Sequence, residues 1–175
     1  MICKFGKSFC LCLMENAFFM DETWVSSDRL ERFTDASGKI GYGAVFGSSW
    51  FYGIWNEEWL NYNITVKEFY PVILAVESWG ETMASEAICF HCDNEALVYV
   101  INNLTSHETH VLKLLRKLIF LSLKYNILFK AVDIPGEKNK YSDAFSRLQI
   151  QGFLALMPGA DQFPMAVPTL PKLPC

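Results

Sequence analysis

The chain has 175 residues, of which 51% are hydrophobic, 15% aromatic and 19% charged, enough apolar material for a packed core. This composition excludes a disordered chain, and the net charge of −4 excludes nucleic-acid binding through a uniformly basic surface. The length suits one domain plus tails. We predict an irregular leader at 1–29, the domain at 30–150 and a proline-bearing tail or linker at 151–175.

The organised part of the chain begins with short strand-like runs. Residues 32–36, 41–46 and 50–55 are predicted as three antiparallel strands, and glycine and serine at 47–49 join the last two as a hairpin. The segment Thr65-Val66-Lys67-Glu68 then matches a capping box. Apolar residues at helical spacing follow it as far as Gly80, which predicts a helix.

Strands and helices alternate in the rest of the domain. We predict strands at 87–92 and 127–132, and helices at 94–101, 107–125 and 140–148. Three antiparallel strands followed by αβ units indicate an α/β fold, with a mixed five-stranded sheet flanked by helices.

Six cysteines are present, and Cys89 and Cys92 form a CxxC pair within the strand predicted at 87–92. Residues three apart on a strand point to opposite faces, so this pair alone is poorly placed to bind zinc. We expect reduced thiols in an intracellular compartment, cytoplasmic or nuclear. We expect no membrane partner, because the patchy apolar segment 9–20 is too short to span a bilayer.

Four acidic residues lie at the ends of predicted elements: Asp35, Glu68, Asp93 and Asp143. Each alone has a local explanation, respectively a turn former, a capping-box residue, a helix N-cap and an exposed helical acid. Taken together in this order of strands and helices, they can converge on one face of the sheet. Because hard divalent cations such as magnesium prefer oxygen ligands, this placement predicts an acidic metal site.

Basic residues are concentrated in the segment 113–147. It contains eight basic and three acidic residues, a local charge of +5, and the remainder of the chain carries −9. A basic flank beside an acidic centre suits the binding of a phosphate backbone over metal ions. The alternative interpretation is a solvated helix face.

Motifs around the acidic residues resemble those of the ribonuclease H domains attached to reverse transcriptases. Thr34-Asp35-Ala36-Ser37 with Gly41-Tyr42-Gly43-Ala44 is similar to their first strand and hairpin. Glu68 with Ala75 and Trp79 resembles their first helix, and Asp93-Asn94 their fourth-strand motif. The segment 134–147 resembles the terminal motif of long-terminal-repeat and DIRS-type retroelements. The match covers roughly residues 30–165.

The resemblance implies a ribonuclease H-like fold and hydrolysis of the RNA strand of RNA–DNA hybrids, within a retrotransposon reverse transcriptase. It implies that Asp35, Glu68, Asp93 and Asp143 are the catalytic metal ligands and bind two Mg²⁺ ions, with Mn²⁺ as the alternative. We predict six residues that contact the hybrid: Ser37, Asn94, Asn139, Lys113, Arg116 and Lys117. For Asn94 and Asn139 the alternative is local helix capping. A reverse transcriptase polymerase domain is the expected partner, and we expect this chain to be a fragment or a separate reading frame of such an element.

One position departs from the family's pattern. Ten residues before the last catalytic aspartate, these families often carry a histidine on a flexible loop, and this chain has Asp133 there. Histidine can shuttle a proton near neutral pH, which an ionised aspartate does poorly. We therefore expect slow turnover. The alternatives are a catalytically weak or inactive retroelement-derived nucleic-acid-binding domain, and a different nuclease or integrase-like enzyme of the same superfamily.

Overall fold

The computed structural model describes residues 25–26, 32–135, 144 and 147–167. Three strands form an antiparallel sheet in the order β2-β3-β4: β2 (Arg32–Ala36), β3 (Gly41–Phe46) and β4 (Ser49–Ile54). Phe46 pairs with Ser49, so the turn between β3 and β4 has two residues. Gly47 adopts a φ of +56° in this turn, which side chains other than glycine rarely allow. The predicted meander is confirmed, and β4 begins one residue earlier than expected.

A second sheet contains three parallel strands in the order β1-β5-β6: β1 (Val25–Ser26), β5 (Ala87–Cys92) and β6 (Leu128–Asp133). The α/β class is confirmed, but the described residues form two three-stranded sheets in place of one five-stranded sheet. The difference lies at the edge of β5. Val25 and Ser26 pair there with Ile88 and Cys89, whereas β2 pairs along its whole length with β3.

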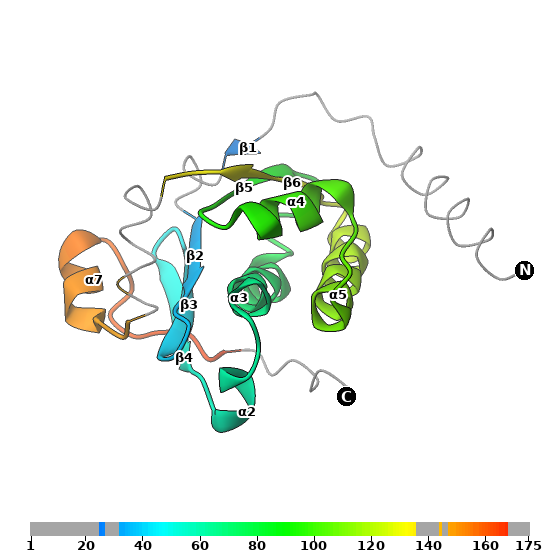
Figure 1. Ribbon diagram of the computed structural model, residues 1–175. Coiled ribbons are helices and arrows are strands. Elements are labelled where there is room, and N and C mark those ends of the chain that lie inside the picture. The colour runs from blue at the N-terminus through cyan, green and yellow to red at the C-terminus, as the bar shows by residue number, and fades with distance from the viewer. Residues whose placement is uncertain (1–24, 27–31, 136–143, 145–146, 168–175) are drawn as a thin grey trace, which may run out of the picture.

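In the part of the chain that the structure describes, the helices are α2 (Glu57–Leu60), α3 (Ile64–Trp79), α4 (Glu95–Asn103), α5 (Thr109–Tyr125) and α7 (Ile150–Leu156). Figure 1 shows α3 between the antiparallel sheet and α5, with α4 beside β6. Phe69, Ile73 and Leu74 of α3 are fully buried. This helix is therefore the centre of the main core, in which residues of both sheets also take part.

The N-terminus of α3 differs from the prediction. Asn63 is the N-cap, and its side chain accepts a hydrogen bond from the backbone N–H of Val66 at 2.9 Å. The predicted capping box from Thr65 to Glu68 is therefore wrong. Asparagine is a stronger N-cap than threonine, and its use moves the start of the helix two residues toward the N-terminus.

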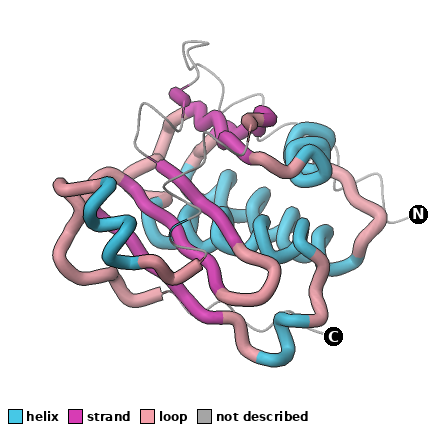
Figure 2. The backbone as a smooth tube through the Cα atoms, turned by 60° about the vertical axis from the view of Figure 1, so that its left-hand side comes forward, coloured by secondary structure: helices cyan, strands magenta, loops and turns pink. Residues whose placement is uncertain are grey.

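The predicted tail contains a helix that packs against the antiparallel sheet. Val45 and Trp50 face α7 and contact Phe153, which is fully buried, while Ala44 and Phe51 face α3. Figure 2 shows this sheet with the C-terminal helix on one face and the long helices on the other. Trp50 Nε1 donates to the carbonyl of Asp161 at 2.8 Å. The boundary at residue 150 stays a prediction, but the segment after it covers a face of the sheet.

Side chains on α3 and α4 fix the two sheets in place. Lys67 is only 3% exposed, and its Nζ donates to the carbonyls of Gly38 at 2.5 Å and Leu60 at 3.2 Å. Asn102 forms two hydrogen bonds of 2.8 Å with the backbone of Ala131 on β6. Among the described residues, no helix is both long and apolar enough to cross a bilayer.

Candidate metal centre

Three metal-ligating side chains meet where the carboxyl end of β5 approaches α3. One ligand atom each from Glu68, Cys92 and Asp93 lies within 4.8 Å of the other two. Glu68 and Cys92 are partly buried, and Asp93 is exposed. These three residues, named here the β5–α3 cluster, line one cavity together with Thr34 of β2. The structure thus brings together two of the four predicted carboxylates.

Local capping does not explain either carboxylate. Glu68 is the fifth residue of α3, beyond the reach of a capping box that starts at Asn63. The N-cap of α4 is Asn94, whose side chain accepts the backbone N–H of Leu97 at 3.1 Å, and Asp93 precedes it. The helix-capping alternative is therefore wrong for Asp93. For Asn94, the structure does show the capping interaction that was the alternative to substrate binding.

Asp35 lies within β2, where its backbone pairs with Gly43. The turn that follows is built by Ser37, whose Oγ accepts the N–H groups of Ile40 and Gly41, both at 2.9 Å. Asp35 thus lies in the strand that precedes this turn, and the Ser37 hydroxyl is engaged in the hairpin. The side chain of Asp35 lies outside what the structure describes, so its convergence with the cluster stays a prediction.

The loop position occupied by Asp133 lies beside the cluster. Asp133 is the last residue of β6 and is exposed, and it pairs in register with Cys92. Neighbouring strands are about 4.8 Å apart, so Asp133 begins its loop at the same sheet edge as Asp93. Asp143 and Asn139, the remaining predicted residues of the site, lie outside the described residues.

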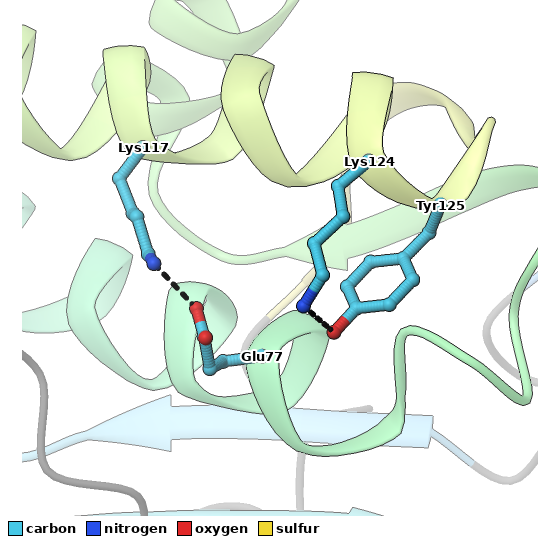
Figure 3. A network of polar contacts seen from close by, with 4 residues as sticks. All are labelled: Glu77, Lys117, Lys124 and Tyr125. Atoms are coloured by element: carbon cyan, nitrogen blue, oxygen red, sulfur yellow. Dashed lines mark hydrogen bonds and ion pairs between the residues drawn. The ribbon is translucent and has the colours of Figure 1, made fainter.

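The predicted phosphate-binding residues of α5 lie away from the β5–α3 cluster. Lys117 Nζ lies 2.6 Å from Glu77 Oε2 on α3, as Figure 3 shows. Glu77 follows Glu68 by nine residues, which in a helix means about 180° around the axis and about 13 Å along it. The structure therefore does not bring Lys117 to the β5–α3 cluster. Arg116 is exposed on the same helix, and Lys113 is partly buried.

The same helix carries a second cation with a local partner. Lys124 Nζ donates to the hydroxyl of Tyr125 at 2.7 Å, and this hydrogen bond raises the pKa of Lys124. Its ammonium group also lies 4.4 Å from the centre of the Tyr125 ring. The positive charge of Lys124 is therefore held at the C-terminal end of α5, where it complements the helix dipole.

No family model and no curated protein sequence matches the chain. Solved structures do. Ribonuclease H1 from the halophilic archaeon Halobacterium salinarum NRC-1 superposes with a TM-score of 0.55 at 13% identity, covering 73% of this chain and 99% of that one. LC11-RNase H1, solved in complex with an RNA/DNA hybrid, gives a TM-score of 0.52 at 20% identity, with coverages of 65% and 91%. The chain has a ribonuclease H-like fold.

The ribonuclease H-like fold confirms the fold that the sequence motifs implied. Within it, the residue missing from the sequence-based site is Cys92. In the sequence, the CxxC spacing suggests that Cys92 acts with Cys89. The feature that indicates its place in the cluster is that Cys92 directly precedes Asp93. Both Cys89 and Cys92 are thiols. Two carboxylates and one thiol are thus the described groups that could bind a metal ion.

Proposed function

We propose that this ribonuclease H-like domain hydrolyses the RNA strand of RNA–DNA hybrids in a metal-dependent reaction. The observation that carries the proposal is the convergence of Glu68 and Asp93 in one cavity, from α3 and from the end of β5. Neither residue caps a helix. Their oxygen atoms are the ligands that hard divalent cations prefer, and they lie close enough together to share one.

The residues that would hold the metal are Glu68 and Asp93, completed by Asp35 and Asp143. Two Mg²⁺ ions, or Mn²⁺ in their place, would activate the attacking water and stabilise the departing 3′ oxygen. The remaining walls of the cavity include the apolar side chains of Val72, Phe90 and Leu97. Such a wall restricts the motion of the ligands and limits access of water to the site.

An RNA–DNA hybrid is the proposed substrate. The neighbour LC11-RNase H1 was solved with such a hybrid, and in this chain Asp93 and Asp133 are exposed at the edge where a strand could approach. Asn94 follows Asp93 at this edge, while the predicted contacts of Ser37 and Asn139 with the hybrid stay proposals from the sequence. Lys113, Arg116 and Lys117 would instead contact phosphates away from the cleavage position, because α5 packs on α3 on the side of Glu77.

We further propose that the domain is the ribonuclease H part of a retrotransposon reverse transcriptase, with a polymerase domain as its partner. The motif at 134–147 supports this context. The second candidate is a catalytically weak or inactive nucleic-acid-binding domain derived from such an element. Its support is Asp133, which puts an acid beside the cluster where the related families often have histidine.

A cleavage assay tests the proposal. Purified protein is incubated with Mg²⁺ and labelled RNA–DNA hybrid, duplex DNA or duplex RNA. We expect cleavage of the RNA strand of the hybrid alone, lost in Asp93→Asn and retained in Glu77→Gln. Cleavage of duplex DNA would contradict the assignment and favour another nuclease of the superfamily. Binding of the hybrid without cleavage of any substrate would favour the second candidate.

A further inference from the structure

We propose that Cys92 converts the β5–α3 cluster into a site for a thiophilic divalent cation, of which Zn²⁺ is the expected ion. This ion would compete with Mg²⁺. The competition rests on the proposed function, whereas the binding of the ion does not require any nuclease activity. Neither the predicted Mg²⁺ site nor the CxxC pair includes this combination of Glu68, Cys92 and Asp93.

The three ligand atoms are close enough to bind one ion after small adjustments. They lie within 4.8 Å of one another, and ligand atoms around one tetrahedral zinc ion are about 3.5 Å apart at the usual bond lengths. The adjustment is therefore about 1 Å. Asp93 is exposed and can rotate without disturbing the core, while Glu68 and Cys92 are held by the elements that carry them.

The strand fixes the direction of the Cys92 side chain. Ile88, Phe90 and Cys92 alternate along β5, so they share the face that packs in the main core with α3. Glu68 is on α3, and this arrangement explains why Sγ reaches its carboxylate. Cys89 lies on the opposite face of β5, which gives the chain a matched control cysteine three residues away.

A backbone group also supports the sulfur. The N–H of Asn94, at the N-terminus of the nine-residue helix α4, donates to Cys92 Sγ at 3.4 Å. Hydrogen bonds of this kind orient metal-bound ligands and stabilise their negative charge. The thiol in turn donates to the carbonyl of Asn94 at 3.8 Å, a contact that binding of the sulfur to a metal ion as a thiolate would end.

The chemistry of the ligands determines which ion is preferred. Mg²⁺ is bound by oxygen atoms in octahedral geometry and gains little from sulfur, whereas thiolate ligands select Zn²⁺ and its heavier analogue Cd²⁺. A site with two carboxylates and one thiolate should therefore bind Zn²⁺ more tightly than Mg²⁺. Zn²⁺ in the cluster would displace the Mg²⁺ that the proposed reaction needs, so Zn²⁺ should inhibit cleavage.

The experiment uses Cd²⁺, because a cadmium–thiolate bond gives an ultraviolet charge-transfer absorption that reports sulfur ligation directly. The full-length chain is titrated in a background with serine at residues 3, 10, 12 and 175, so that Cys89 and Cys92 are its remaining thiols. We expect a saturable band with one Cd²⁺ per chain. It should be lost in Cys92→Ala, kept in Cys89→Ala, and require on the order of tenfold or more Cd²⁺ in Glu68→Gln. Circular dichroism verifies that each variant is folded.

Competition then identifies the preferred ion. Zn²⁺ should abolish the cadmium band at near-equal concentration, and a large excess of Mg²⁺ should not. A band that persists in Cys92→Ala, or one that is unaffected by Glu68→Gln, would overturn the proposal. Cadmium binding as expected without hybrid cleavage would leave this inference standing and reject the proposed function. Cleavage without a cadmium band would reject this inference alone.

Discussion

Two glutamates on opposite sides of α3 have different surroundings. Glu77 lies 2.6 Å from Lys117 of α5, so its charge is paired within the protein. Glu68 lies with Asp93 and Cys92, so its charge adds to that of another acid in a small cavity. The first arrangement stabilises helix packing. The second arrangement gathers metal-binding atoms at the end of β5, which is the kind of donor set that a cation site needs.

The largest expected effect is a difference in nuclease activity between variants of these two glutamates. Glu68→Gln removes a proposed metal ligand and should lower Mg²⁺-dependent hybrid cleavage by on the order of 10²–10³-fold, because metal-ion catalysis supplies several kcal/mol. Glu77→Gln, the matched control on the same helix, should retain full activity. Initial rates on a labelled hybrid measure both. Equal losses in the two variants would show that α3 as a whole is sensitive and that Glu68 has no special role.

The next effect concerns the stability that α7 contributes far from the β5–α3 cluster. Phe153 is fully buried between α7 and the antiparallel sheet, and Phe153→Ala should reduce the free energy of unfolding by about 3–5 kcal/mol. Urea unfolding followed by tryptophan fluorescence measures it, since Trp50 lies 5.2 Å from the Phe153 ring. Leu156→Ala, exposed on the same helix, is the control. A change below 1 kcal/mol would mean that α7 is not part of the stable domain.

The sequence predicts the strands and helices of the core well, since their signals are local. The short apolar and aromatic runs at 41–46 and 87–92 match β3 and β5 residue for residue, and the helical spacing after Glu68 predicts α3. These elements depend on signals within a few residues, which a single sequence contains. The convergence of Glu68 and Asp93 is instead expected from the order of strands and helices and from the resemblance to ribonuclease H domains.

Other features depend on pairing between distant segments and could not be predicted in this way. The two-residue strand β1 is too short for periodicity, yet it pairs with β5 in a sheet from which β2 is absent. The helix α7 lies in a proline-bearing segment, and its packing depends on Trp50, about 100 residues earlier. The contribution of Cys92 to the cluster likewise requires the position of α3 against β5.

A smaller effect is expected at the residue next to Glu68. Lys67 is buried and connects α3 to the carbonyls of Gly38 and Leu60, so Lys67→Met leaves two carbonyls without this donor. The free energy of unfolding should fall by about 1–3 kcal/mol. Lys67→Arg, which keeps the donors, should recover part of the loss. If Lys67→Met is as stable as the unmodified chain in thermal unfolding, water replaces the ammonium group. The hydrogen bonds of Lys67 would then contribute nothing to the stability of the hairpin.

The smallest effect concerns the paired glutamate. Glu77 and Lys117 side chains are 27% and 30% exposed, so solvent screens their attraction and the pair should contribute about 0.2–1 kcal/mol. A double-mutant cycle with Glu77→Gln and Lys117→Met measures this coupling in urea at low and high salt, and the value should decrease as salt increases. A coupling above 2 kcal/mol would place the pair in a much less solvated environment. The contrast with Glu68 would then lie in the neighbouring groups: Glu77 faces a lysine, whereas Glu68 lies within 4.8 Å of an acid and a thiol.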